Sequence, residues 1–231
     1  MKPMHLSRPA VLESGGGMGD SPIPVKSRRT RVSPWALRET VLDAAHELFY
    51  VNGYGFTSVE EIARASRTHK MTVYRLFSSK EKLAIAYLER VKRSAADQWD
   101  ILLRQHHDVP LHVLRTYFAH LAYEVRAESY LGDRSLKLAL EVHDASSEIV
   151  RVCESHRLLQ RERFKRIAEL SGFGHSAGFG DSLYLVWLAT VMPGRGKAER
   201  RRDALSMRAL FTHVMLSAEA GVVDWLQCLA T

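Results

Sequence analysis

The sequence predicts an all-α fold, and three observations lead to that prediction. Apolar residues recur at spacings of three and four along most of the chain, which is the pattern of a helix that buries one face. Ser58 and Glu61 form a capping box, in which a serine and a glutamate three residues later satisfy free backbone amides at a helix start. No segment keeps the strict polar–apolar alternation of a strand, and no internal repeat is found.

Four helices are predicted in the first half of the chain. The first begins at Ser33-Pro34, because the serine hydroxyl can cap free amides and proline fits the first helical position. Ser78 with Glu81 gives a second capping box and predicts the start of a long helix. The predicted segments are Ser33 to Gly53, a short helix from Ser58, His69 to Phe77, and Ser78 to about Leu103.

Five more helices are predicted in the second half from their apolar faces. A glycine-rich stretch and the Pro193-Gly194 pair separate the last three of them. The predicted faces lie within Val113 to Val125, Leu136 to Val142, Ile149 to Leu170, Leu183 to Met192, and Met207 to Ala218.

The composition is that of a globular protein. The chain has 231 residues, of which 46% are hydrophobic and 26% are charged. Its longest apolar run, Leu183 to Met192, is about half the length that crosses a bilayer, so we predict no membrane helix. The N-terminus lacks a basic start followed by an apolar block, so we predict no secretory signal. Cys153 and Cys228 are too few for a disulfide framework or a clustered zinc site, which favours the reducing cytoplasm.

We find no catalytic, metal-binding or cofactor motif in the sequence. His106 and His107 are neighbours in the chain, so on a helix they diverge by about 100° and cannot share one face. The Glu141-Val142-His143-Asp144 segment could form an acid–base pair, but no nucleophile motif accompanies it. We therefore predict no metal, no cofactor and no enzyme activity.

Positive charge is concentrated in the first half of the chain, which carries most of the net charge of +7. Residues 1–32 hold six basic and two acidic residues, 33–105 hold eleven and nine, and 106–231 hold sixteen and fifteen. Residues 64–80 contain five basic residues and no acidic one. A basic surplus confined to one region is typical of a module that binds a polyanion.

Two short predicted helices joined by a tight turn, with a supporting helix before them, indicate a helix-turn-helix unit. In such a unit the second helix lies in the major groove of DNA and presents small or polar residues to base edges. Here this helix runs from about His69 to Phe77. The basic residues around it can neutralise phosphates and gain affinity from counterion release.

These segments resemble the TetR-type (tetracycline-repressor-like) family of bacterial transcription regulators. The resemblance implies an N-terminal three-helix helix-turn-helix domain that binds DNA, followed by a helical domain that binds a ligand and forms a dimer. The residues that carry the resemblance are Val41-Leu42-Asp43-Ala44-Ala45 to Leu48-Phe49, Gly53-Tyr54, Thr57-Ser58-Val59-Glu60-Glu61-Ile62-Ala63, and Thr72-Val73-Tyr74-Arg75-Leu76-Phe77-Ser78-Ser79-Lys80-Glu81-Lys82-Leu83.

The resemblance also implies a set of DNA contacts. Residues 69–72 would lie nearest the base edges, whereas Tyr74 and Lys80 would reach phosphates. Lys26 to Arg31 is either a solvated tail or an arm that enters the minor groove, where a narrow groove attracts arginine. The implied DNA-binding residues are Arg28, Arg29, Arg31, Ser58, Thr68, His69, Lys70, Met71, Thr72, Tyr74, Arg75 and Lys80.

One segment departs from the family pattern. Ser66-Arg67-Thr68-His69 stands where the family usually has Ala-Gly-Val-Ser. A glycine accepts positive φ in the turn, so we expect Arg67 to bear a steric cost there. His69 replaces a hydroxyl cap, which leaves the base preference open.

The resemblance further implies a homodimeric regulator, most often a repressor, which a small-molecule effector releases from a near-palindromic operator in double-stranded DNA. We predict a flexible basic tail at 1–32, the DNA-binding domain at 33–78, and the ligand-binding and dimerisation domain at 79–231. The composition favours an apolar or aromatic effector. The candidate pocket residues are Trp99, Leu103, Tyr117, Phe118, His120, Leu121, Leu138, His143 and Trp187. The candidate dimer-interface residues are Leu185, Leu188, Met207, Leu210, Phe211, Val214 and Met215.

Alternatives remain open for these assignments. Aromatic residues at helical spacing are often simple core residues rather than pocket residues. A non-specific architectural DNA binder would use the same basic arm, with little sequence preference and a nearly complete dependence on salt. The third hypothesis is a helical enzyme, and detectable turnover of a bound ligand would support it.

Overall fold

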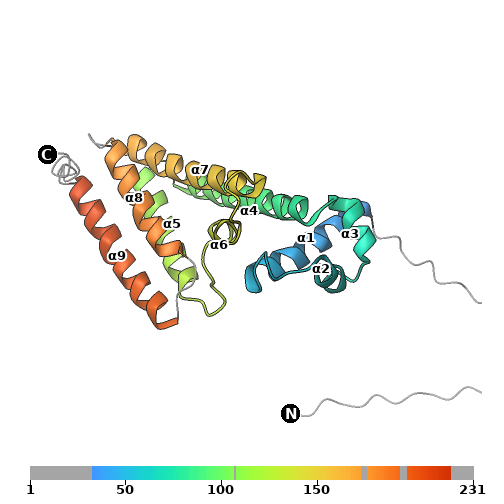
Figure 1. Cartoon of the computed structure of the whole chain (residues 1–231). Coiled ribbons are helices and arrows are strands. Elements are labelled where there is room, and N and C mark those ends of the chain that lie inside the picture. The colour runs from blue at the N-terminus through green and yellow to red at the C-terminus, as the bar shows by residue number, and fades with distance from the viewer. Residues whose placement is uncertain (1–32, 107, 173–175, 193–196, 220–231) are drawn as a thin grey trace, which may run out of the picture. The chain divides into compact units, whose positions relative to one another are not determined.

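The computed structural model describes residues 33–106, 108–172, 176–192 and 197–219, and within these ranges it contains nine helices and no strand (Figure 1). The predicted all-α fold is therefore confirmed for the described residues. Arg28, Arg29 and Arg31 of the predicted basic arm lie outside them. The helices are α1 (Pro34–Val51), α2 (Val59–Ala65), α3 (Lys70–Phe77), α4 (Lys80–Gln105), α5 (Pro110–Val125), α6 (Arg134–Glu141), α7 (Glu148–Leu170), α8 (Ser176–Val191) and α9 (Lys197–Glu219).

Serine caps set the starts of the first two helices as the sequence predicts. The Ser33 hydroxyl accepts a hydrogen bond from the Ala36 amide at 3.1 Å, with Pro34 in the first helical position. The capping box at α2 has both of its bonds, because Ser58 accepts from the Glu61 amide and Glu61 accepts from the Ser58 amide. These bonds satisfy amides that have no partner inside the helix.

The predicted cap of α4 is wrong by one residue. Ser79, rather than Ser78, caps this helix, and its hydroxyl accepts from the Lys82 amide at 3.0 Å. Ser78 instead ends α3 with a φ of 60°, in the left-handed region. A helix commonly ends in this conformation. Ser78 therefore ends α3, and Ser79 caps the start of α4.

Two groups of buried residues form the core, and the first one joins the helix-turn-helix to later helices. It contains the buried faces of α1, α2, α3 and the start of α4, together with Leu138 of α6 and Ile149 and Cys153 of α7. The second group lies between the rest of α4 and helices α5, α7, α8 and α9. Helix α6 lies between the α1–α3 group and the rest of the bundle (Figure 1).

The turn after α1 is held by the last residue of α6. Gly53 has a φ of 92°, and a Cβ atom built on it would lie 2.7 Å and 2.8 Å from the two carboxylate oxygens of Glu141. Glu141 Oε2 also accepts a hydrogen bond from the Gly55 amide at 2.9 Å. The backbone conformation favours glycine at position 53, and a Cβ atom there would displace the Glu141 carboxylate from its hydrogen bond with the Gly55 amide.

We predict that Gly53→Ala lowers the free energy of unfolding by more than Gly172→Ala does. Gly172 also has a positive φ, of 75°, but no atom lies within 4 Å of a Cβ built there. The control therefore measures backbone strain alone, at about 1 kcal/mol, and the excess at Gly53 measures the cost of displacing the Glu141 carboxylate from the Gly55 amide. Urea unfolding of the full-length chain gives both values, and equal losses would contradict the proposed contact.

Candidate DNA-binding surface and inner cavity

Helices α2 and α3 form the helix-turn-helix by packing their apolar faces on α1 and α4. Val59, Ile62, Ala63, Val73 and Phe77 are buried. The opposite face of α3 begins with His69, Lys70 and Met71, all exposed, and the Met71 side chain is 76% exposed. Thr68, Thr72, Tyr74 and Ser58 are partly buried, and Arg75 is exposed. The fold thus brings the predicted contact residues of positions 68–75 onto one short helix and its turn.

The turn between α2 and α3 carries the expected strain. Arg67 has a φ of 53°, a conformation that costs a side-chain-bearing residue about 1–2 kcal/mol. The Ser66 hydroxyl donates to the Ile62 carbonyl at 2.7 Å, and the Thr68 amide donates to the Ala63 carbonyl at 2.8 Å. His69 makes no side-chain cap hydrogen bond at the start of α3.

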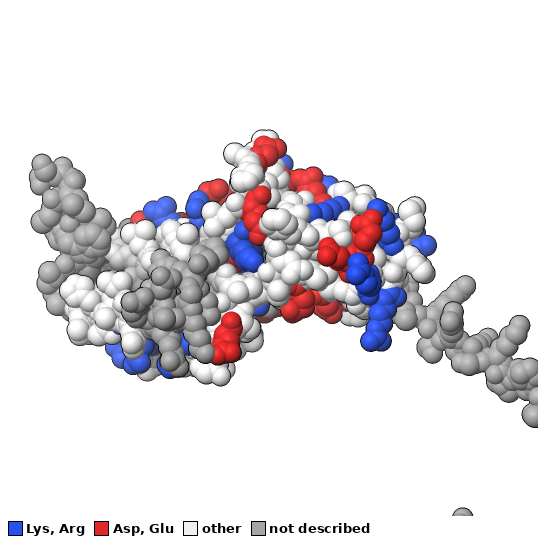
Figure 2. Space-filling view, turned by 60° about the horizontal axis from the view of Figure 1, so that its bottom comes forward, with Lys and Arg blue, Asp and Glu red and all other residues white. Residues whose placement is uncertain are grey.

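Basic and acidic side chains lie side by side on this part of the molecule (Figure 2). Lys70 forms an ion pair with Glu60 of α2. Lys80, at the start of α4, places its ammonium nitrogen 4.4 Å from the centre of the Tyr54 ring. Partial burial lowers the pKa of Lys80, and the nearby carboxylate of Glu141 opposes that shift. The side chain that is predicted to bind a phosphate, Lys80, therefore packs against the Tyr54 ring.

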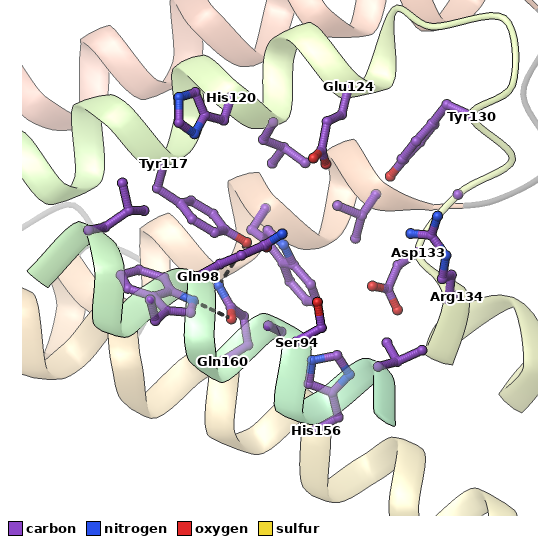
Figure 3. A pocket seen from close by; sticks show the side chains of 18 of the residues that line it. Ser94, Gln98, Tyr117, His120, Glu124, Tyr130, Asp133, Arg134, His156 and Gln160 are labelled. Carbon is purple, nitrogen blue, oxygen red and sulfur yellow. Dashed lines mark hydrogen bonds between the residues drawn. The ribbon is translucent and has the colours of Figure 1, made fainter. Parts of the chain in front are cut away.

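A cavity of about 1030 Å³ lies among helices α1, α4, α5, α6, α7 and α8 (Figure 3). Five of the predicted pocket residues line it: Trp99, Tyr117, His120, Leu121 and Trp187. The other four do not. Phe118 is buried in the second core group, Leu138 is buried in the first, and Leu103 and His143 are exposed.

One end of the cavity is an aromatic wall formed by Trp99 and Tyr117, and the side-chain amide of Gln160 is hydrogen-bonded to both. The rings of Trp99 and Tyr117 stack with centroids 4.7 Å apart. The Trp99 indole donates to Gln160 Oε1 at 3.1 Å, and Gln160 Nε2 donates to the Tyr117 hydroxyl at 3.0 Å. Such a bridge fixes the orientation of both rings.

The other end is polar and is built by the segment that leads into α6. Tyr130, Asp133 and Glu124 point into the same space as Tyr117 (Figure 3). Asp133 caps α6 by accepting from the Ser135 and Leu136 amides, and its own amide donates to the Val191 carbonyl at 2.9 Å.

The same segment is bonded to the end of α1. The Tyr50 hydroxyl accepts from the Leu131 amide at 2.7 Å and donates to the Gly132 carbonyl at 3.1 Å. Lys137 Nζ donates to the Tyr50 carbonyl at 2.6 Å. The Arg134 guanidinium lies 4.6 Å from the centre of the Tyr50 ring. A wall of the cavity is therefore directly connected to the helix on which the helix-turn-helix packs.

The predicted interface residues of α8 and α9 differ in exposure. Leu185 and Leu210 are 55% and 50% exposed, Leu188, Phe211 and Val214 are partly buried, and Met207 and Met215 are buried. Two other leucines of α9, Leu205 and Leu216, are also exposed. No helix of the described residues is long and apolar enough to cross a membrane, and no group of three metal-binding side chains is found among them.

Comparison with known proteins agrees with this arrangement. The sequence model of the "Bacterial regulatory proteins, tetR family" matches residues 41–87. The chain is 28% identical over 148 residues to the HTH-type transcriptional regulator TcmR of Streptomyces glaucescens, a match that covers 64% of this chain and 58% of TcmR. It is 37% identical over 73 residues to the uncharacterized HTH-type transcriptional regulator Rv1556 of Mycobacterium tuberculosis, covering 31% of this chain and 36% of that protein.

A solved structure shows the same fold. The TetR-family regulator SCO4454 of Streptomyces coelicolor superimposes with a TM-score of 0.65 and 18% identity, over 81% of this chain and 95% of that one. The chain is therefore similar to TetR-family regulators in sequence over residues 41–87 and in fold. Both sequence relatives are named as transcriptional regulators, and the matches span less than two thirds of the length of either.

The match to the TetR-family model covers the helix-turn-helix and its neighbouring helices. Residues 41–87 run from the middle of α1 through α2 and α3 into α4. The cavity residues His156 and Gln160, on α7, were missed by the sequence prediction. Their signal was their place on the buried stripe of α7, which continues through Cys153, Phe164 and Ile167.

We predict that Arg67→Gly raises the free energy of unfolding by about 1 kcal/mol, because glycine adopts the observed positive φ without strain. Arg67→Ala is the matched control, since it removes the same charge but keeps the unfavourable conformation. Urea unfolding compares the two variants with the unmodified chain. An equal gain in both would assign the effect to charge instead.

We also predict a pH dependence of stability that depends on His156. This buried residue donates from Nδ1 to Ser135 Oγ at 3.1 Å, because the serine proton goes to Asp133, and burial lowers its pKa below the ordinary value of 6.5. The unfolded chain then binds the proton more readily, so this contribution is complete above about pH 6.5 and declines as the pH falls below it.

The pH profile of the free energy of unfolding between pH 7 and 5 tests this prediction. His156→Gln should have a profile that is flatter by at most about 1.4 kcal/mol per pH unit. Identical profiles in the unmodified chain and in His156→Gln would mean that His156 does not titrate on unfolding.

Proposed function

We propose that the chain is a sequence-specific DNA-binding transcription regulator that reads the major groove with α3. The observation that carries this proposal is the exposed first turn of α3, with His69, Lys70 and Met71 on a framework that the TetR-family model matches. Polar and basic side chains at the start of such a helix read base edges, while flanking groups bind phosphates. A DNA target places the protein in the cytoplasm.

The proposed active form is a homodimer joined through α8 and α9. Leu185, Leu205, Leu210 and Leu216 expose apolar surface on these two helices, and pairing with a second copy would remove that surface from water. A two-fold dimer would bind a near-palindromic operator, because the two α3 helices would then face equivalent half-sites. Light scattering at micromolar concentration tests this state, and a monomer would contradict it.

The cavity supports regulation by a small-molecule effector. Its volume of about 1030 Å³ accommodates an organic molecule, and the Trp99–Tyr117 wall suits an apolar or aromatic one. Tyr130 and Asp133 line the cavity and flank the segment that bonds to Tyr50. An effector that binds better when this segment has shifted would lower operator affinity by its differential binding to the two states, which is the behaviour of a released repressor.

Fluorescence anisotropy with DNA that flanks the gene of this protein tests the function. A preference of about a thousandfold over random duplex, kept across a salt series, would establish a sequence-specific regulator. If a genome-wide selection also yields no preferred sequence, a non-specific architectural DNA binder replaces the proposal, since its binding would depend almost entirely on salt.

We predict that Lys80→Ala weakens binding to operator and random duplex alike and reduces the salt slope by about 1, as expected for a phosphate contact. Lys70→Ala and Thr72→Ala should instead change the base preference, because their positions face base edges. Anisotropy titrations on both duplexes separate the two roles. Equal, sequence-independent losses in all three variants would contradict the assignment.

A further inference from the structure

Helix α2 presents two neighbouring glutamates, and the structure uses them differently. Glu61 turns back to its own helix start, where its Oε2 accepts from the amide and the hydroxyl of Ser58 at 2.7 Å and 2.8 Å. Glu60 reaches across the turn and forms an ion pair with Lys70, the first residue of α3. The two side chains of this pair are 53% and 48% exposed.

The Glu60–Lys70 pair lies on the surface that would face DNA. Lys70 precedes the exposed Met71, and residues 64–80 contain no acidic side chain, so Glu60 brings a carboxylate to an otherwise basic face. The hydrogen bond between the pair lowers the pKa of Glu60 and raises that of Lys70, so both groups stay charged at neutral pH.

This carboxylate has opposite effects on the two modes of DNA binding. It repels phosphates and neutralises Lys70, which weakens sequence-independent attraction to the DNA backbone. In the major groove, however, guanine offers the acceptors O6 and N7, and its paired cytosine offers the donor N4. A lysine ammonium can donate to the guanine acceptors, and a glutamate carboxylate beside it can accept from the cytosine amino group.

We propose that Glu60 is a specificity-determining residue that acts with Lys70 as one recognition unit for a G·C base pair and disfavours binding through phosphates alone. The inference rests on the DNA-binding function proposed above. Lys70 donates to the guanine edge and Glu60 accepts from the cytosine amino group. The ion pair holds the two side chains together in the free protein, so little rearrangement is needed on binding.

Selection of duplexes from a randomised library by the full-length protein tests the proposal. The unmodified chain should select a G·C pair at one position of each half-site. Glu60→Gln should lose discrimination at that position by about fivefold or more and keep the other positions. Glu154→Gln is the matched control, because Glu154 forms a comparable exposed ion pair with Arg157 within α7, and its selected sequence should be unchanged.

Binding to random duplex gives a second readout that a merely structural role would not produce. Glu60→Gln should bind random DNA more tightly than the unmodified chain, because Lys70 is released to phosphates. Its slope of log affinity against log salt should become steeper by up to about 0.9, the value for one additional phosphate contact. A misfolded variant would lose affinity instead, and circular dichroism identifies it.

The outcomes separate this inference from the function on which it rests. If the unmodified chain selects a sequence but Glu60→Gln keeps the same preference or binds random DNA no more tightly, the role of Glu60 is refuted and the proposed function stands. If the unmodified chain selects no sequence, both fall. A selected sequence without a G·C pair at a position that responds to Glu60→Gln also overturns the inference.

Discussion

The arrangement of this molecule depends on how the segment before α6 binds the end of α1. The Tyr50 hydroxyl satisfies both the Leu131 amide and the Gly132 carbonyl, and Lys137 satisfies the Tyr50 carbonyl. Backbone groups in such a partly buried place would be costly to leave without partners. Because α2 and α3 pack on α1 through one core that also includes residues of α4, α6 and α7, these three bonds help to fix the position of α3 relative to the cavity.

The segment before α6 also lines the cavity through Tyr130 and Asp133. It is therefore bonded to α1 on one side and to α7 and α8 on the other. Asp133 is bonded to α8 through Val191, and Ser135 is bonded to α7 through His156. A ligand that displaces the segment would have to break bonds on both sides together. Under the proposed function, coupling between the cavity and α3 then requires no long pathway, since the contacts are contiguous. The size of this coupling is limited by the difference in ligand affinity between the two positions of the segment.

Local signals in the sequence predicted the helices well. The pocket residues were predicted less completely, because they depend on which helices become neighbours in the fold. Ser33 and Ser58 cap their helices as their spacing indicates, but the shift from Ser78 to Ser79 arises from the stop of the preceding helix. Apolar periodicity showed that Leu138 is buried but not in which core. The spacing within α7 indicates that Gln160 is buried, but it does not indicate what Gln160 contacts. Its partners, Trp99 and Tyr117, come from two other helices.

The turn between α2 and α3 holds a backbone conformation that is unfavourable for the residue it contains. Glycine would adopt the φ of 53° at position 67 at lower cost, yet arginine stands there, and the bonds of Ser66 to Ile62 and of Thr68 to Ala63 hold the turn in spite of it. Strain of this kind persists only where surrounding bonds over-determine the backbone. The arginine adds a positive charge beside the start of α3, and under the proposed function this charge attracts DNA phosphates at a cost in folding stability.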